Sequence, residues 1–189
     1  DRKSISNRYN KVLRLTSYPV AVKMFEHLEE FQEVKDKKGR PVGRIGEGKF
    51  TVCQLLAQAR YLGKTIAGIA ESLSMCMPGA AAMGFQELPE GFADGHVGAY
   101  YTDEEIARKN MAAIPKLEMG KYVAMLASPL ERMPIDPDIV LFFGNTAQIY
   151  RFIHGYLYNR VGRLEFSSSG LVGCSDLIVA PLQSGRPGI

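Results

Sequence analysis

The sequence predicts an α/β fold in which a mixed sheet is flanked by helices. Segments with the apolar period of a helix alternate along the chain with short apolar segments typical of strands. The composition agrees, because 46% hydrophobic and 23% charged residues are typical of a globular protein. At this length we expect a single domain, residues 1–189.

The first half of the chain predicts three helices and two strands. Their expected order is helix 1–18, strand 19–26, helix 50–63, strand 64–72 and a helix of small residues that opens at Pro78. Alternating apolar and polar residues over 19–26 indicate a half-buried strand. Thr51 is the expected N-cap of the third element, and Gly63 is its expected end.

The second half predicts helices again alternating with strands. The expected order is helix 102–114, strands 121–130 and 137–144, helix 146–162, strand 163–168 and a helix that starts at Cys174. Thr102, three residues before Glu105, indicates a capping box, and Asn145 or Thr146 is the expected cap of the next helix. The continuous apolar run in 137–144 predicts a strand buried on both faces.

Two stretches follow one plan of strand, helix, glycine, strand, cysteine and small helix. They cover residues 18–84 and 137–184, and the distance from glycine to cysteine is similar in both. We therefore expect two related strand-helix-strand-helix halves, in which Cys76 and Cys174 are pseudo-equivalent.

Charge and hydropathy exclude several classes of protein. The net charge is +3, and the basic excess lies mainly in residues 35–44, which contain no aromatic residue to stack on a base. We therefore expect no nucleic-acid partner. No apolar stretch is long enough to cross a membrane, and no secretory pattern begins the chain, so we expect a cytoplasmic protein with no membrane association.

Three cysteines are the main candidates for chemistry. Cys53, Cys76 and Cys174 form no CxxC pair, and their odd number argues against a disulfide framework. Each is expected at the start of a helix, where backbone N–H groups favour a thiolate. The sequence therefore predicts that the three thiolates bind one iron–sulfur cluster, of the 4Fe-4S type, with one iron left open.

Other interpretations of the cysteines stay open. Zinc in a Cys3His site would take His27, His96 or His154 as its fourth ligand, although no close ligand pair is present. A nucleophilic Cys76 would need His96 or Glu71 as a base. Free cysteines are also common as small apolar core residues.

Two glycine-containing turns suggest a small anionic ligand. Residues 142–148 and 169–174 each place glycine between an expected strand and an expected helix, where backbone amides can meet an anion. Four tyrosines are candidates to line a pocket: Tyr100, Tyr101, Tyr156 and Tyr158. We also expect a protein or redox partner, and a homo-oligomer stays open.

Five blocks of the sequence resemble a known family. They are "YPVAVKMF", "CQLLAQARYLGKTI", a cysteine followed by Pro-Gly-Ala, "ASPLERMPIDPDIVLFFGNTAQIYRFIHGYLY" and "GCSDLIVAPLQSGRP". Together they resemble, over residues 18–187, the uncharacterised ArCR family, a domain of unknown function found in archaea and anaerobic bacteria. The resemblance implies that Cys53, Cys76 and Cys174 belong to recurrent blocks and that the protein serves anaerobic metabolism.

Two functions are therefore expected from the sequence. The first is a redox or accessory protein of anaerobic metabolism, active in electron transfer, that holds an iron–sulfur cluster through the three cysteines. The alternative is a metal-free ligand-binding or assembly subunit with buried structural cysteines. The sequence does not indicate a reaction, so it leaves open whether the protein is an enzyme.

Overall fold

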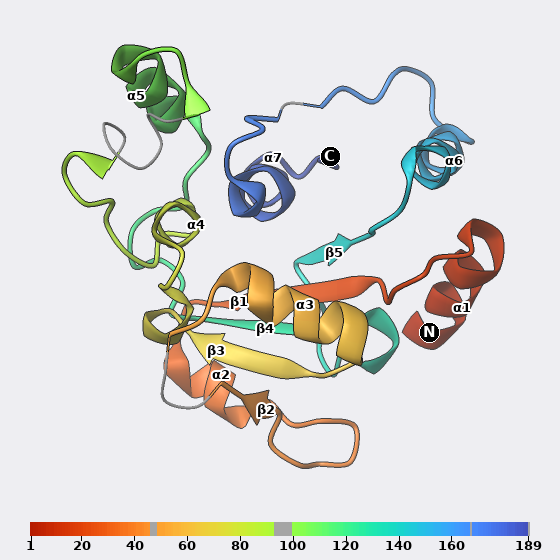
Figure 1. Ribbon diagram of the computed structural model, residues 1–189. Helices are drawn as coiled ribbons and strands as arrows, with labels where there is room; N and C mark the ends of the chain where they lie inside the picture. Colours follow the sequence, from red (N-terminus) through yellow and green to blue (C-terminus); the bar gives the residue numbers. More distant parts are fainter. Residues whose placement is uncertain (46–48, 93–99, 167, 189) are drawn as a thin grey trace.

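The structure is an α/β fold built on a five-stranded mixed sheet (Figure 1), as the sequence predicts. This computed structural model describes residues 1–45, 49–92, 100–166 and 168–188. The strands are β1 (Val20–Phe25), β2 (Gly43–Arg44), β3 (Ile66–Ile69), β4 (Ala124–Pro129) and β5 (Ile139–Leu141). They lie in the order β2-β3-β4-β1-β5; only β2 and β3 pair in parallel, and the other neighbours are antiparallel.

Among the described residues, seven α-helices accompany the sheet. They are α1 (Arg2–Leu13), α2 (Leu28–Glu33), α3 (Val52–Leu62), α4 (Met77–Ala82), α5 (Glu104–Ala113), α6 (Thr146–Leu157) and α7 (Ala180–Ser184). A π-helix, Ser175–Val179, leads directly into α7. Across the described ranges, each helix is too short or too polar to span a lipid bilayer.

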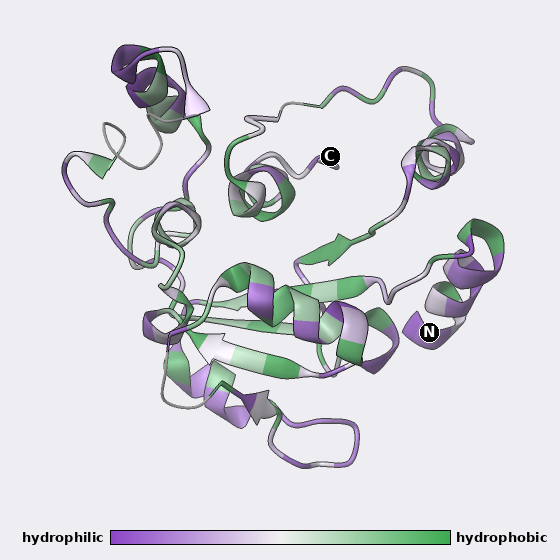
Figure 2. Cartoon of the chain, viewed as in Figure 1, coloured by the Kyte–Doolittle hydropathy of each residue, from purple (hydrophilic) through white to green (hydrophobic). Residues whose placement is uncertain are grey.

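The central strands are buried on both faces of the sheet. Val20 and Val22 of β1 pack into a core that includes residues of α3 and α4, whereas Ala21 and Phe25 pack into a second core with Phe31 of α2. Figure 2 shows the same contrast, with hydrophobic residues along the central strands and hydrophilic ones on α2 and α5. Helix α3 is therefore fixed against one face, which determines where its first turn lies.

The burial of the strands corrects two expectations. The strand at 19–26 is not half-buried: β1 is a central strand, and only Lys23 is partly exposed, where it forms an ion pair with Asp138 at 2.7 Å. The strand within 137–144 is not buried on both faces, because β5 is an edge strand and Ile139 and Val140 stay half-exposed. Apolar composition alone does not reveal a strand's place in the sheet.

Several element boundaries also differ from expectation. Helix α1 ends at Leu13, well before Pro19, because Arg14 adopts a left-handed conformation with φ 51°. Helix α5 is capped by Asp103, whose carboxylate accepts from the N–H of Ile106, rather than by Thr102.

The remaining differences concern elements gained and lost. Among the described residues of 163–168 there is no strand, so the second predicted half lacks its second strand, and the internal repeat stays a prediction. Helix α2 and strand β2 were not predicted, because both lie in charged segments without a clear apolar period.

Candidate thiol site

The three cysteines, separated by up to 121 positions in sequence, meet at one end of α3. Cys53 is the second residue of α3, Cys76 immediately precedes α4, and Cys174 immediately precedes the π-helix. The expected position of each cysteine at the start of a helix is thus confirmed. Cys53 is exposed, Cys76 is half-buried, and Cys174 is only 5% exposed, so the group extends from the surface inward.

Gly79 provides the space between two of the sulfurs. A Cβ atom added at Gly79 would lie 3.2 Å from Cys174 Sγ and 3.3 Å from Cys76 Sγ. The separation of these two sulfurs is therefore at most the sum of these distances, about 6.5 Å. Only a glycine leaves this space open, so Gly79 belongs to the site although it carries no side chain.

Backbone hydrogen bonds fix Cys53 relative to Cys76. The N–H of Phe50 donates to Ser72 O at 2.6 Å, and the N–H of Met75 donates to Phe50 O at 3.1 Å. The residues just before the first cysteine are thus paired with those just before the second.

The first turn of α3 is fixed by a complete capping box. Thr51 Oγ1 accepts from the N–H of Gln54 at 3.0 Å, and Gln54 Oε1 accepts from the N–H of Thr51 at 2.8 Å. Thr51 is therefore the N-cap, as the sequence predicts, and its geometry sets the direction in which Cys53 leaves the helix.

Asp176 holds the loop that precedes Cys174. Its carboxylate accepts from the N–H groups of Ser169 and Gly170 and from the hydroxyls of Ser168 and Ser169, at 2.9 to 3.1 Å. Burial alone would raise the pKa of Asp176, but these four hydrogen bonds outweigh it and place the pKa below its usual value. The carboxylate is thus a buried anchor two residues from the third cysteine.

A hydrogen bond between two thiols polarises the pair. The S–H of Cys174 donates to the Cys53 sulfur, which lowers the pKa of Cys53 to about 6 and raises that of Cys174. Burial and the nearby charges of Cys53 and Cys76 raise the pKa of Cys174 further. Of this pair, the exposed Cys53 is therefore the thiol that ionises more readily, and the buried Cys174 holds its proton more tightly.

The structure also bears on the other cysteine interpretations. Within the described ranges, no three His, Cys, Asp or Glu side chains meet closely enough to hold a single metal ion, so the zinc site finds no support there. His96 lies outside those ranges. The most exposed thiol is Cys53 rather than Cys76, which changes the first candidate for a nucleophile.

Both turns predicted to bind an anion use some of their N–H groups in hydrogen bonds within the chain. At 142–148, Asn145 and Gln148 form a second capping box, with bonds of 2.8 and 3.0 Å. At 169–174, the carboxylate of Asp176 accepts the N–H groups that an anion would otherwise contact. The predicted small anionic ligand thus stays a prediction.

Two residues of the site escaped the sequence analysis. Gly79 carries a weak signal, because glycine is disfavoured in a helix where alanines follow it. Asp176 had a signal too, since a lone acidic residue in an apolar helix close to serines and glycines indicates a buried hydrogen-bonding role.

The fold and the site define an α/β protein with three thiols gathered at helix starts. Residues 9–189 match the model of DUF169, the uncharacterised ArCR family, and the chain belongs to that family. An uncharacterised protein of Methanocaldococcus jannaschii is 32% identical over 133 residues, which cover 68% of this chain and 56% of that protein. The matched region thus spans little more than half of the relative's length. No solved structure matches the chain.

Proposed function

We propose that Cys53, Cys76 and Cys174 hold an iron–sulfur cluster and that the protein is a redox or accessory protein of anaerobic metabolism. The observation that carries this proposal is the convergence of three cysteines, remote in sequence, around the space left by Gly79. Such a cluster supplies one-electron transfer and, with three protein ligands, one iron open to a further ligand.

The donor set fits this group. The sulfurs of Cys76 and Cys174 lie at most about 6.5 Å apart, and the thiol of Cys53 interacts directly with that of Cys174, so the three donors are already close to one another. Thiolates are the usual ligands of iron–sulfur clusters, and N–H groups at the start of α3 favour a negative charge beside Cys53.

The contact between Cys53 and Cys174 is closer than a cluster requires. Binding therefore requires Cys53 to turn away from Cys174 about its χ1 angle. Because Cys53 is exposed, this rotation displaces no core side chain. Cys174 stays in place, since the helix that begins beside it is held by the bond of Ser175 Oγ to Pro115 O at 2.6 Å.

The accessibility of the thiols favours this proposal over the alternative. A metal-free binding subunit with buried structural cysteines should bury all three thiols, yet only Cys174 is buried. Exposed cysteines are uncommon without a ligand or a reaction, because they oxidise readily.

Anaerobic purification, or reconstitution with iron and sulfide, tests the proposal. We expect a brown protein with absorbance near 400 nm and about four irons per chain. Serine at position 53, 76 or 174 should each lower the iron content sharply. The matched changes His27→Gln and His154→Gln should leave it intact, because His27 precedes α2 and His154 lies in α6, and neither element carries a cysteine.

Two results would contradict the cluster. The first is a colourless protein with three titratable thiols after reconstitution, which would favour the metal-free subunit. The second is iron that stays bound in all three serine variants, which would place it elsewhere.

A further inference from the structure

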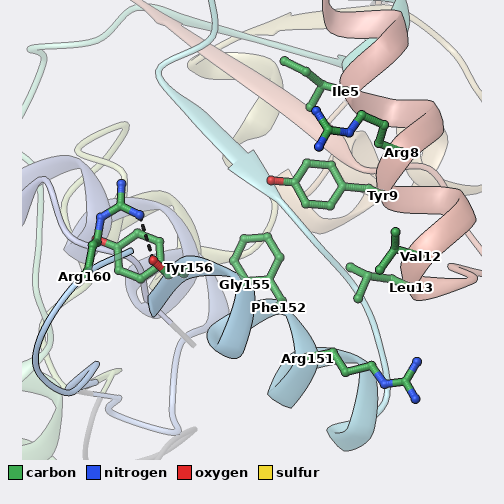
Figure 3. Close-up of a pocket in the computed structure, with 10 residues that line it drawn as sticks. All are labelled: Ile5, Arg8, Tyr9, Val12, Leu13, Arg151, Phe152, Gly155, Tyr156 and Arg160. Carbon is green, nitrogen blue, oxygen red and sulfur yellow. Dashed lines mark hydrogen bonds between the residues drawn. The ribbon is translucent and has the colours of Figure 1, made fainter. Parts of the chain in front are cut away.

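A second candidate site lies between α1 and α6. A pocket of about 580 Å³ is lined by both helices and by Arg160, which follows α6 (Figure 3), and none of the three cysteines lines it. Its volume is within the range of small-molecule sites, roughly 300–1,000 Å³. Gly155 widens it on the α6 side, because a Cβ atom there would meet nothing within 4 Å.

The walls of this pocket are positively charged without compensation. Arg8, Arg151 and Arg160 line it, and no lining residue is acidic. Helix α1 carries four Lys or Arg residues, and neither α1 nor α6 contains an Asp or Glu. In the part of the chain that the structure describes, the side chains of Arg8 and Arg151 make no ion pair or hydrogen bond. Three arginines in a lining without an acidic residue give the pocket a positive potential, which attracts an anion.

Three aromatic rings, those of Tyr9, Phe152 and Tyr156, line the pocket beside aliphatic side chains of α1. Tyr9 and Phe152 pack against each other with ring centroids 5.8 Å apart, and both also contact Phe142, at 4.6 and 4.8 Å. At the other end, Arg160 stacks on Tyr156 at 4.4 Å and donates to Tyr156 O at 2.7 Å. Figure 3 shows Tyr9 of α1 above Phe152 of α6, with Arg8 beside Ile5 on the far side of Tyr9, Arg160 beside Tyr156, and Arg151 pointing away from the other lining residues.

We propose that this pocket binds a mononucleotide, with its base against Tyr9 and Phe152 and its phosphates on Arg8 and Arg160. Aromatic rings stack on any nucleobase, and guanidinium groups recognise phosphate through paired N–H donors. The Nε and Nη2 donors of Arg160 stay available, because its two hydrogen bonds both leave from Nη1. The site is independent of the cysteines and of any cluster.

The shape of the site favours a small ligand over a surface. A membrane or a nucleic-acid strand would need a flat or extended basic face, whereas these residues enclose a hollow between two helices. Of the four tyrosines proposed from the sequence, Tyr156 lines this pocket and the other three do not. Tyr158 is 91% exposed, Tyr100 is 75% exposed, and Tyr101 packs against the main core.

Calorimetric titration of the protein with ADP in 150 mM salt tests this assignment. We expect saturable binding at one site. Adenosine and pyrophosphate should each bind more weakly, because adenosine lacks the phosphates and pyrophosphate lacks the base. Arg8→Gln and Arg160→Gln should each weaken ADP binding about tenfold or more. Lys11→Gln is the matched control: it removes the same charge from α1 outside the pocket and should leave affinity within about twofold.

Several results would overturn the proposal. One is binding that does not saturate at millimolar ADP. Another is an equal loss of ADP affinity in Arg8→Gln and Lys11→Gln. If pyrophosphate bound as tightly as ADP, the rings of Tyr9 and Phe152 would contribute nothing to binding of the base. Tighter binding to a single-stranded oligonucleotide or to acidic phospholipid vesicles would assign the basic face to one of those partners instead. A variant in which all three cysteines are serine should bind ADP normally, which separates this test from that of the cluster.

Discussion

Replacement of Gly79 by alanine tests the geometry of the thiol site most directly. The added Cβ would approach Cys174 Sγ to 3.2 Å and Cys76 Sγ to 3.3 Å. Ordinary nonbonded heavy atoms stand roughly 3.5–4.0 Å apart, so both sulfurs would have to move. Cys76 is half-buried and can shift, whereas Cys174 is buried and donates to Cys53.

The expected magnitude follows from two opposing contributions. Overpacking of this kind costs about 1–3 kcal/mol, while alanine in place of glycine in a helix gains up to about 1 kcal/mol. The free energy of unfolding should therefore fall by about 1–2 kcal/mol. In a chain of this size that lowers Tm by about 2–8 °C.

Thermal unfolding of the metal-free protein, followed by circular dichroism, measures this change. Gly173→Ala is the matched control, because it lies beside Cys174, has no positive φ, and its Cβ would meet nothing within 4 Å. Its Tm should stay the same or rise by up to about 4 °C. After reconstitution, Gly79→Ala should bind less iron than Gly173→Ala.

The reasoning fails if the two alanine variants shift Tm in the same direction by the same amount. In that case the sulfurs do not surround Gly79 in solution, and the observation behind the proposed cluster is lost. A rise in Tm for Gly79→Ala would have the same meaning.

Three further predictions concern the surroundings of the site. In the metal-free protein, the rate of alkylation of Cys53 should rise with pH to a plateau, with a midpoint near pH 6. Cys174→Ala removes the S–H donor and should move that midpoint to higher pH. An unchanged midpoint would refute the interaction between the two thiols. Asp176→Asn should cost about 1–3 kcal/mol at neutral pH, measured by urea unfolding. Because the pKa of Asp176 is lowered in the fold, this difference should be present above about pH 4 and shrink as the carboxyl is protonated at lower pH; a pH-independent difference would contradict the anchor. Thr51→Ala should cost about 0.5–2 kcal/mol, whereas Thr102→Ala, outside the observed cap of α5, should cost almost nothing; equal losses would contradict the capping assignment.

Local sequence signals identified the elements on which the site is built. The capping pattern at Thr51 and the stop at Gly63 located α3 within two residues at each end, because both act through the nearest backbone groups. The same reasoning placed the N-cap of α5 one residue too early, at Thr102 instead of Asp103. Both residue types are good caps, and the path of the chain into the helix determines that Asp103 takes this position. The strand predicted at 163–168 is absent from the described residues of that segment, because a strand forms only where a neighbouring strand pairs with it, and the local sequence pattern does not reveal such a neighbour.

The sequence by itself determined that the chain forms an α/β fold and that each cysteine stands at the start of a helix. Capping, periodicity and propensity are short-range effects, and they are encoded within about four residues of where they act. Only the tertiary structure decided that these three helix starts meet at Gly79, that Asp176 anchors one of them, and that Arg8 and Arg160 share a pocket. Those contacts depend on how the two faces of the sheet are covered, which is set by the packing of the whole chain.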